Sequence, residues 1–243
     1  MLQSSKRNCS PVSNSQKQTH AAGLPMRRRT PQYPSQRSLS STIGLDTASG
    51  IGVENARTVT PGSGEVVVAV IDSGILPHPD IRARVIAGAD LINDTLSNDG
   101  DGRDSDNTDD GDSFEGRASS WHGLHVAGTF GASMSNGIGV AGIDRRARVQ
   151  PTGALGTCGG YSSDVDDAIR WAAGLPMPGV PSNPTPANVV NLSLGGSGAC
   201  SSIEQSAIDA SVAAGAVVAV AVGKSASDLD AASFSPASRP PGV

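Results

Sequence analysis

Asp72 and His122 are the residues of this sequence whose types and settings offer chemistry. Asp72 follows the apolar run 66–71, and a carboxylate that emerges from a buried strand is desolvated unless it is paired. The plainer interpretation is an Asx-turn or a helix cap. His122 opens a run of small residues, 122–129, a pattern that packs a helix closely against a sheet with the imidazole in its first turn. A zinc pair with His125 lacks the glutamate of the zincin motif, so we expect His125 to be a core residue.

A third segment, residues 191–196 (Asn-Leu-Ser-Leu-Gly-Gly), ends an apolar run in a glycine pair. Glycines at the end of a strand let another backbone approach closely, as a bound peptide must. An ordinary strand-to-loop turn has the same composition. The residues alone leave both interpretations open.

The elements that must position these residues are buried strands and capped helices in alternation. The β-branched runs 66–71, 188–193 and 216–222 predict strands buried on both faces. Helices are predicted from Ser162-Ser163 to Gly174 and from Ser201-Ser202 to Gly215. This order predicts an α/β fold with a parallel sheet, whose active site lies at the carboxyl ends of the strands. Residues 1–50 are rich in Ser, Gln, Arg and Pro and are expected to form a disordered extension to the domain 51–243.

Composition excludes several classes of partner. The net charge of −5 at pH 7 gives no broad basic field, so no nucleic-acid partner is expected. Nothing approaches the roughly 20 consecutive apolar residues of a membrane span. Residues 1–7 lack the apolar core of a secretory signal. We expect a monomer that does not contact a membrane, and its cellular destination stays open.

Together these segments resemble the subtilase family of subtilisin-like serine peptidases. Residues 69–75 (Ala-Val-Ile-Asp-Ser-Gly-Ile) are similar to its Asp motif, residues 122–129 to its His motif, and residues 191–196 to its peptide-binding strand. The Asp precedes the His, the order of subtilisin, in which the serine comes last. The resemblance implies a three-layer subtilisin-like fold with a mostly parallel sheet, incomplete at the C-terminus.

The resemblance also implies peptide-bond hydrolysis by an Asp-His-Ser triad. His122 would accept a proton from a serine hydroxyl, and Asp72 would fix the imidazole tautomer. A polypeptide substrate would lie as an added strand between two segments of the chain. The substrate-binding residues so implied are Leu155, Gly156 and Gly160 on one side and Ser193, Leu194 and Gly195 on the other.

Three departures from the family pattern concern the chemistry. The nucleophile motif Gly-Thr-Ser-Met-Ala does not occur in the sequence. Lys224 stands where the family has an Asn whose amide donates to the oxyanion, and Leu124 stands where it usually has Thr. Leu124 either crowds the imidazole or repacks away from it.

These departures lead to three functional hypotheses. The first is a subtilisin-like endopeptidase homologue that is inactive as this chain because the nucleophilic serine is absent. The second is a peptide-binding pseudoprotease that uses the cleft without cleavage. The third is an active protease whose remaining segment belongs to a split or frame-shifted gene. The family is typically secreted.

Residues 98–112 concentrate carboxylates in one loop. Calcium takes six to eight oxygen ligands, and related proteases often bind it in such loops, although the spacing is not that of an EF-hand. The alternative is a solvated acidic insertion. The candidate ligands are Asp99, Asp101, Asp104 and Asp106.

The cysteines offer one candidate disulfide. Cys158 and Cys200 both lie in glycine-rich segments beside the implied peptide cleft. A disulfide between them would clamp that cleft in an oxidising compartment, and free thiols are the alternative.

Overall fold

The computed structural model describes residues 30–39, 50–93, 100–224, 226, 228–229 and 233–238. Strands β1 (Val67–Asp72), β2 (Ala89–Asp90), β3 (Arg148–Gly153), β4 (Val189–Leu192) and β6 (Val217–Val220) form a sheet in the order β2-β3-β1-β4-β6, and all the pairings are parallel. A separate antiparallel pair joins β5 (Gly196–Ser197) to β7 (Phe234–Ser235). The predicted α/β fold with a mostly parallel sheet is confirmed.

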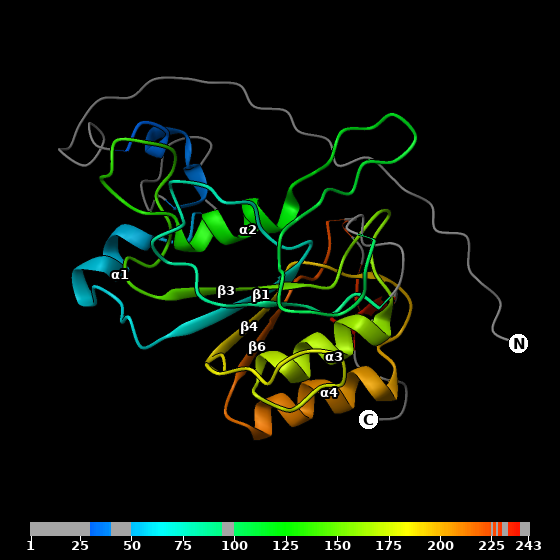
Figure 1. The fold of residues 1–243 in the computed structure, drawn as a ribbon. Coiled ribbons are helices and arrows are strands. Elements are labelled where there is room, and N and C mark those ends of the chain that lie inside the picture. Colours follow the sequence, from blue (N-terminus) through cyan, green and yellow to red (C-terminus); the bar gives the residue numbers. More distant parts are fainter. Residues whose placement is uncertain are drawn as a thin grey trace, which may run out of the picture.

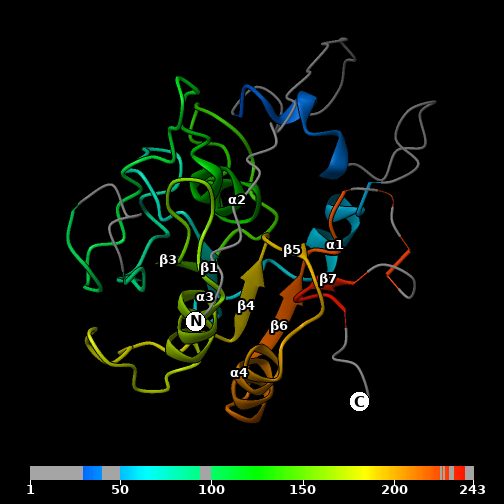
Figure 2. The ribbon, with the colours of Figure 1, turned by 90° about the vertical axis from the view of Figure 1, so that its right-hand side faces the viewer.

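Helices lie on both faces of the sheet (Figures 1 and 2). On one face α3 (Ser162–Ala172) and α4 (Ser202–Ala213) pack over a core that contains Ile71, Trp171 and Leu192, all at most 2% exposed. On the other face α2 (His122–Gly131) covers β1 and β3 through a smaller cluster around Val70, Ala127 and Val149. The chain reaches this arrangement because alternate residues of each central strand are apolar on both sides.

The α2 face of β6 is bare among the described residues. Val218 and Val220 pack toward α4, whereas Val217 is 63% exposed and Ala219 is also exposed. The prediction that residues 216–222 are buried on both faces is therefore wrong for this strand. No described strand pairs with its outer edge.

Residues 30–39 are packed against the domain. They form the 3₁₀ turns η2 (Tyr33–Ser35) and η3 (Arg37–Leu39), and Tyr33 and Leu39 are buried with Ala141 beside α1 (Val53–Val59). The Gln36 amide donates to the Ala141 carbonyl over 2.9 Å and accepts from the Ala141 N–H over 2.7 Å. Disorder is therefore the wrong prediction for residues 30–39, because a side-chain amide and two apolar anchors hold them. Apart from residue 50, the rest of 1–50 lies outside the described residues.

The two predicted helices on the α3–α4 face are present, with different starts. Ser201 caps α4, its hydroxyl accepting from the Glu204 N–H over 3.0 Å, as the sequence predicted. The cap position of α3 is occupied by Tyr161, whose side chain makes no capping bond. Within the described residues, no helix is both long and apolar enough to cross a membrane.

Candidate active site

Asp72 ends β1 in the centre of the sheet and is fully buried. Its backbone is fixed by neighbouring β3, and the Ser73 N–H donates to its Oδ1 over 2.9 Å. A buried carboxylate requires hydrogen-bond partners. The second partner of Asp72 is His122 on α2.

His122 is the first residue of α2, and its Nδ1 lies 2.9 Å from both carboxylate oxygens of Asp72. Since the carboxylate can only accept, Nδ1 carries the proton and the neutral ring presents a lone pair at Nε2. No described residue donates to or accepts from Nε2, and the side chain is 38% exposed. This geometry leaves Nε2 able to accept a proton from a group that approaches it.

The helix reaches Asp72 because Gly123 carries no side chain. A Cβ at this position would lie 2.1 Å from the carbonyl oxygen of Gly74. The Gly123 N–H instead donates to Ser73 Oγ over 3.1 Å. The small-residue run at the start of α2 thus sets the distance between His122 and Asp72.

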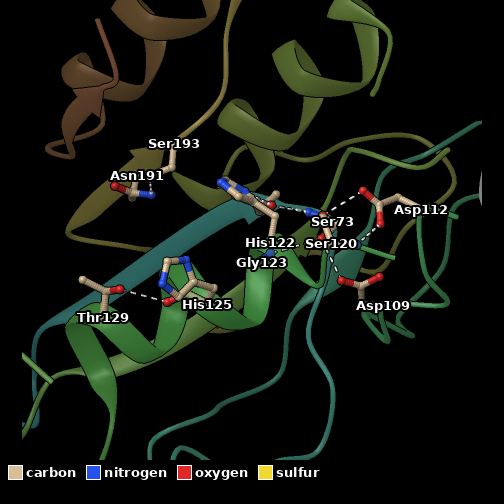
Figure 3. A network of polar contacts seen from close by, with 11 residues as sticks. Ser73, Asp109, Asp112, Ser120, His122, Gly123, His125, Thr129, Asn191 and Ser193 are labelled. Atoms are coloured by element: carbon tan, nitrogen blue, oxygen red, sulfur yellow. Dashed lines mark hydrogen bonds and ion pairs between the residues drawn. The ribbon is translucent and has the colours of Figure 1, made fainter. Parts of the chain in front are cut away.

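Ser73 and Asp109 form a bridge that the sequence analysis did not assign. The Ser73 hydroxyl donates to Asp109 Oδ2 over 2.7 Å while it accepts from the Gly123 N–H (Figure 3). Asp109 Oδ1 accepts from the Gly111 N–H. Burial raises the pKa of Asp109, and the Ser73 hydrogen bond opposes that rise. The bridge ties the end of β1, the start of α2 and the acidic loop together.

The hydrogen bond from Asp72 raises the pKa of His122 above its ordinary value of 6.5. Burial opposes the rise, the charges of Asp72 and Asp112 add to it, and the ammonium of Lys224 lowers the pKa. Because the pKa of His122 is raised in the folded state, the His122–Asp72 pair contributes its full stabilisation below pH 6.5. That stabilisation is lost as the pH rises through the pKa of His122 in the folded protein.

Asp72→Asn is expected to lower the pKa of His122 below that of the wild-type chain, because it removes the charge and keeps the shape. An NMR titration of the His122 ring protons measures it. Asp112→Asn, which removes a weaker charge effect, should lower the same pKa by less. An unchanged His122 pKa in Asp72→Asn would contradict the pairing.

A cavity of about 470 Å³ lies between the two segments that the sequence analysis assigned to substrate. Leu155, Gly159 and Gly160 line one wall, and residues 193–196 line the other. Gly156 is placed differently, since its backbone pairs with Gly159 in a tight turn and it lines a smaller hollow beside Asp109. Of the six assigned residues, five therefore line one cavity: Leu155, Gly160, Ser193, Leu194 and Gly195.

Comparisons with known proteins agree with this geometry. The profile of the subtilase family matches residues 63–240. The chain belongs to the subtilase family. An extracellular protease of Xanthomonas campestris is 46% identical over 193 residues, which is 75% of this chain and 33% of that protein. An extracellular basic protease of Dichelobacter nodosus is 44% identical over 177 residues, 67% of this chain and 29% of that one.

A solved structure has the same fold. A protease from Pseudoalteromonas arctica matches with a TM-score of 0.78 at 42% identity, covering 86% of this chain and 62% of that chain. This subtilase chain thus spans about a third of the length of the two extracellular proteases.

Three further residues that the sequence analysis singled out have different surroundings. Lys224 follows β6, is exposed, and is near enough for its charge to act on His122. Leu124 packs into the cluster beneath α2, so of the two predicted outcomes it repacks. His125 is exposed, and the prediction of a core residue is wrong because the buried side of α2 carries Gly123, Ala127 and Gly131.

The described carboxylates of the acidic loop are not gathered around one point. Asp104 and Asp106 each accept the backbone N–H two residues further on, over 2.7 and 3.0 Å, which is turn geometry. Within the described part of the chain, no group of three or more His, Cys, Asp or Glu residues could hold a metal ion, and this holds for Asp101 too. Asp99 lies outside the described residues. Calcium binding by this loop stays a prediction.

The predicted disulfide between Cys158 and Cys200 is wrong. Cys200 is a free thiol, 2% exposed at the start of α4, and Cys158 is disulfide-bonded to a different partner. Burial, with the neighbouring Glu204, raises the pKa of Cys200 to about 12, so the thiol is unreactive at neutral pH. Cys9 lies outside the described residues.

Proposed function

We propose that this chain provides the acid–base pair and the peptide cleft of a subtilisin-type serine endopeptidase site. We propose further that residues 1–243 bind extended polypeptide without cleaving it. The observation that carries the proposal is the His122–Asp72 pair, in which Nδ1 lies 2.9 Å from the carboxylate and Nε2 has no partner among the described residues, beside a cavity walled by two glycine-rich segments.

In the reaction of the family, His122 would remove the proton of a hydroxyl nucleophile through Nε2 and pass it to the leaving amine. Asp72 would hold the Nδ1–H tautomer and stabilise the imidazolium. The raised pKa of His122 supports this role, because the folded site already favours the charged ring. The described residues place no hydroxyl at Nε2, and this supports binding without cleavage by residues 1–243.

The substrate would lie as an extended strand between residues 155–160 and 193–196, with one side chain in the cavity. The two relatives are named extracellular proteases, which supports a site of action outside the cell. A monomer is proposed for the same site, since a single chain supplies both walls of the cleft.

Fluorescence anisotropy tests the cleft with four-residue peptides that carry fluorescein at the amino end. Wild-type chain should bind them saturably and release them uncleaved. Gly196 lines the cavity, and a Cβ there meets nothing within 4 Å, so Gly196→Leu should abolish binding without disturbing the fold. Gly102→Leu, at an equally open position in the acidic loop, is the matched control and should bind normally. Equal binding by both variants would refute the proposed cleft.

A further inference from the structure

Among the described residues that line the cavity between the two cleft walls, one is charged. The described lining of the cavity is made of glycines, serines and apolar side chains, with Glu204 as the exception. Glu204 lies in the first turn of α4 and is 5% exposed. A carboxylate so far removed from water at the wall of a cavity dominates the electrostatics of that cavity.

Glu204 has no cationic partner among the described residues. Its Oε2 accepts from the hydroxyl of Ser235, and its other neighbour is the thiol of Cys200. The described ion pairs involve Asp72, Asp164 and Asp167, not Glu204. Buried carboxylates are ordinarily paired with a positive charge, so this one lacks the partner that burial calls for.

A second buried carboxylate strengthens the negative potential near Glu204. Asp166 on α3 is 3% exposed, and its Oδ1 has no hydrogen-bond partner among the described residues. Burial and then the charge of Glu204 raise the pKa of Asp166 to about 6. Arg170 is the nearby cation, but its guanidinium is directed to Asp167 and to the backbone carbonyls of residues 166 and 203.

We propose that the cavity accepts a lysine or arginine side chain of the bound peptide, with Glu204 as its counter-ion. The inference rests on the proposed peptide cleft and adds its selectivity. The apolar side chains of Leu155 and Val165 in the lining suit the aliphatic stem of such a residue, and the cavity of about 470 Å³ has room for its length. Glu204 then determines specificity by offering a charge that a neutral side chain leaves unpaired.

Peptides that differ at one position test the proposal in the wild-type chain. Fluorescein-Ala-Ala-Pro-X-amide is titrated by anisotropy with X as lysine, norleucine or glutamate. Norleucine keeps the length of the lysine stem and lacks the charge. Lysine should bind about tenfold more tightly than norleucine, and glutamate more weakly than either. The preference should persist at high salt, since the pair is shielded from solvent.

Glu204→Gln removes the charge and keeps the side-chain size, and its melting temperature checks the fold. It should lose the lysine preference while its affinity for the norleucine peptide stays unchanged. Glu65→Gln removes the same charge at an exposed position and should keep the preference. Saturable binding with norleucine equal to lysine in the wild type overturns this inference alone. Absence of saturable binding for every peptide overturns the proposed cleft as well.

Discussion

Gly123→Ala is expected to destabilise the domain by about 2 kcal/mol and to separate His122 from Asp72. The new Cβ would lie 2.1 Å from the Gly74 carbonyl oxygen and 3.2 Å from the Gly74 nitrogen and carbonyl carbon, all of which are backbone atoms. Overpacking of this kind costs about 1–3 kcal/mol because helix and strand must move apart. The displacement would also stretch the bond between Gly123 N–H and Ser73 Oγ. The pKa of His122 should therefore fall toward its ordinary value.

Gly128→Ala is the matched control on the same helix. A Cβ at Gly128 meets nothing within 4 Å, so this variant should gain about 0.5–1 kcal/mol from the better helix propensity of alanine. Urea unfolding measures both stabilities, and an NMR titration of His122 measures both pKa values. Opposite signs for the two variants are the expected result. A Gly123→Ala chain as stable as Gly128→Ala would show that α2 does not need its close approach to β1.

The strands that carry the site differ in how well the sequence predicts them. β1 and β4 could be predicted because both are rich in valine and other apolar residues. β3 could not, although it lies between β2 and β1, because Gln150 and Pro151 interrupt its apolar pattern. A proline lacks the N–H that a ladder uses. Gln150 is accommodated in the core because its side-chain amide donates hydrogen bonds to the Ala87 carbonyl and to Asn183 Oδ1.

The site itself could be predicted where a motif is local, and not where distant loops meet. Asp72 and His122 each sit in a recognisable run, so their proximity followed from the family resemblance. The Ser73–Asp109 bond and the position of Glu204 on the cavity depend on loops that the sequence cannot place. Ser201 and Glu204 have the spacing of a capping box, in which the glutamate would turn back to the cap. The structure instead turns its carboxylate toward Ser235 and the cavity.

Residues 1–243 are expected not to react with a fluorophosphonate, a reagent that labels activated serines. The reaction needs a hydroxyl at Nε2 of His122, and no described residue supplies one. In subtilisin itself, loss of the nucleophilic serine lowers turnover by about 2 × 10⁶. We expect this chain to be labelled more slowly by a similar factor, about 10⁶, than an intact subtilase labelled in parallel. Labelling should be done well above the raised pKa of His122, so that a protonated ring does not explain the result.

His122→Ala separates the two ways in which labelling could still occur. Labelling that persists in His122→Ala comes from a serine that the imidazole does not activate, so it contradicts the expected lack of labelling but not the inference that no serine lies at Nε2. Labelling that disappears would contradict it, because a serine of this chain would then reach Nε2. The first serines to replace by alanine would be Ser225 and Ser227, since they closely follow Lys224 in the sequence and the charge of Lys224 acts on His122. Whichever replacement removed the label would identify the serine that His122 activates.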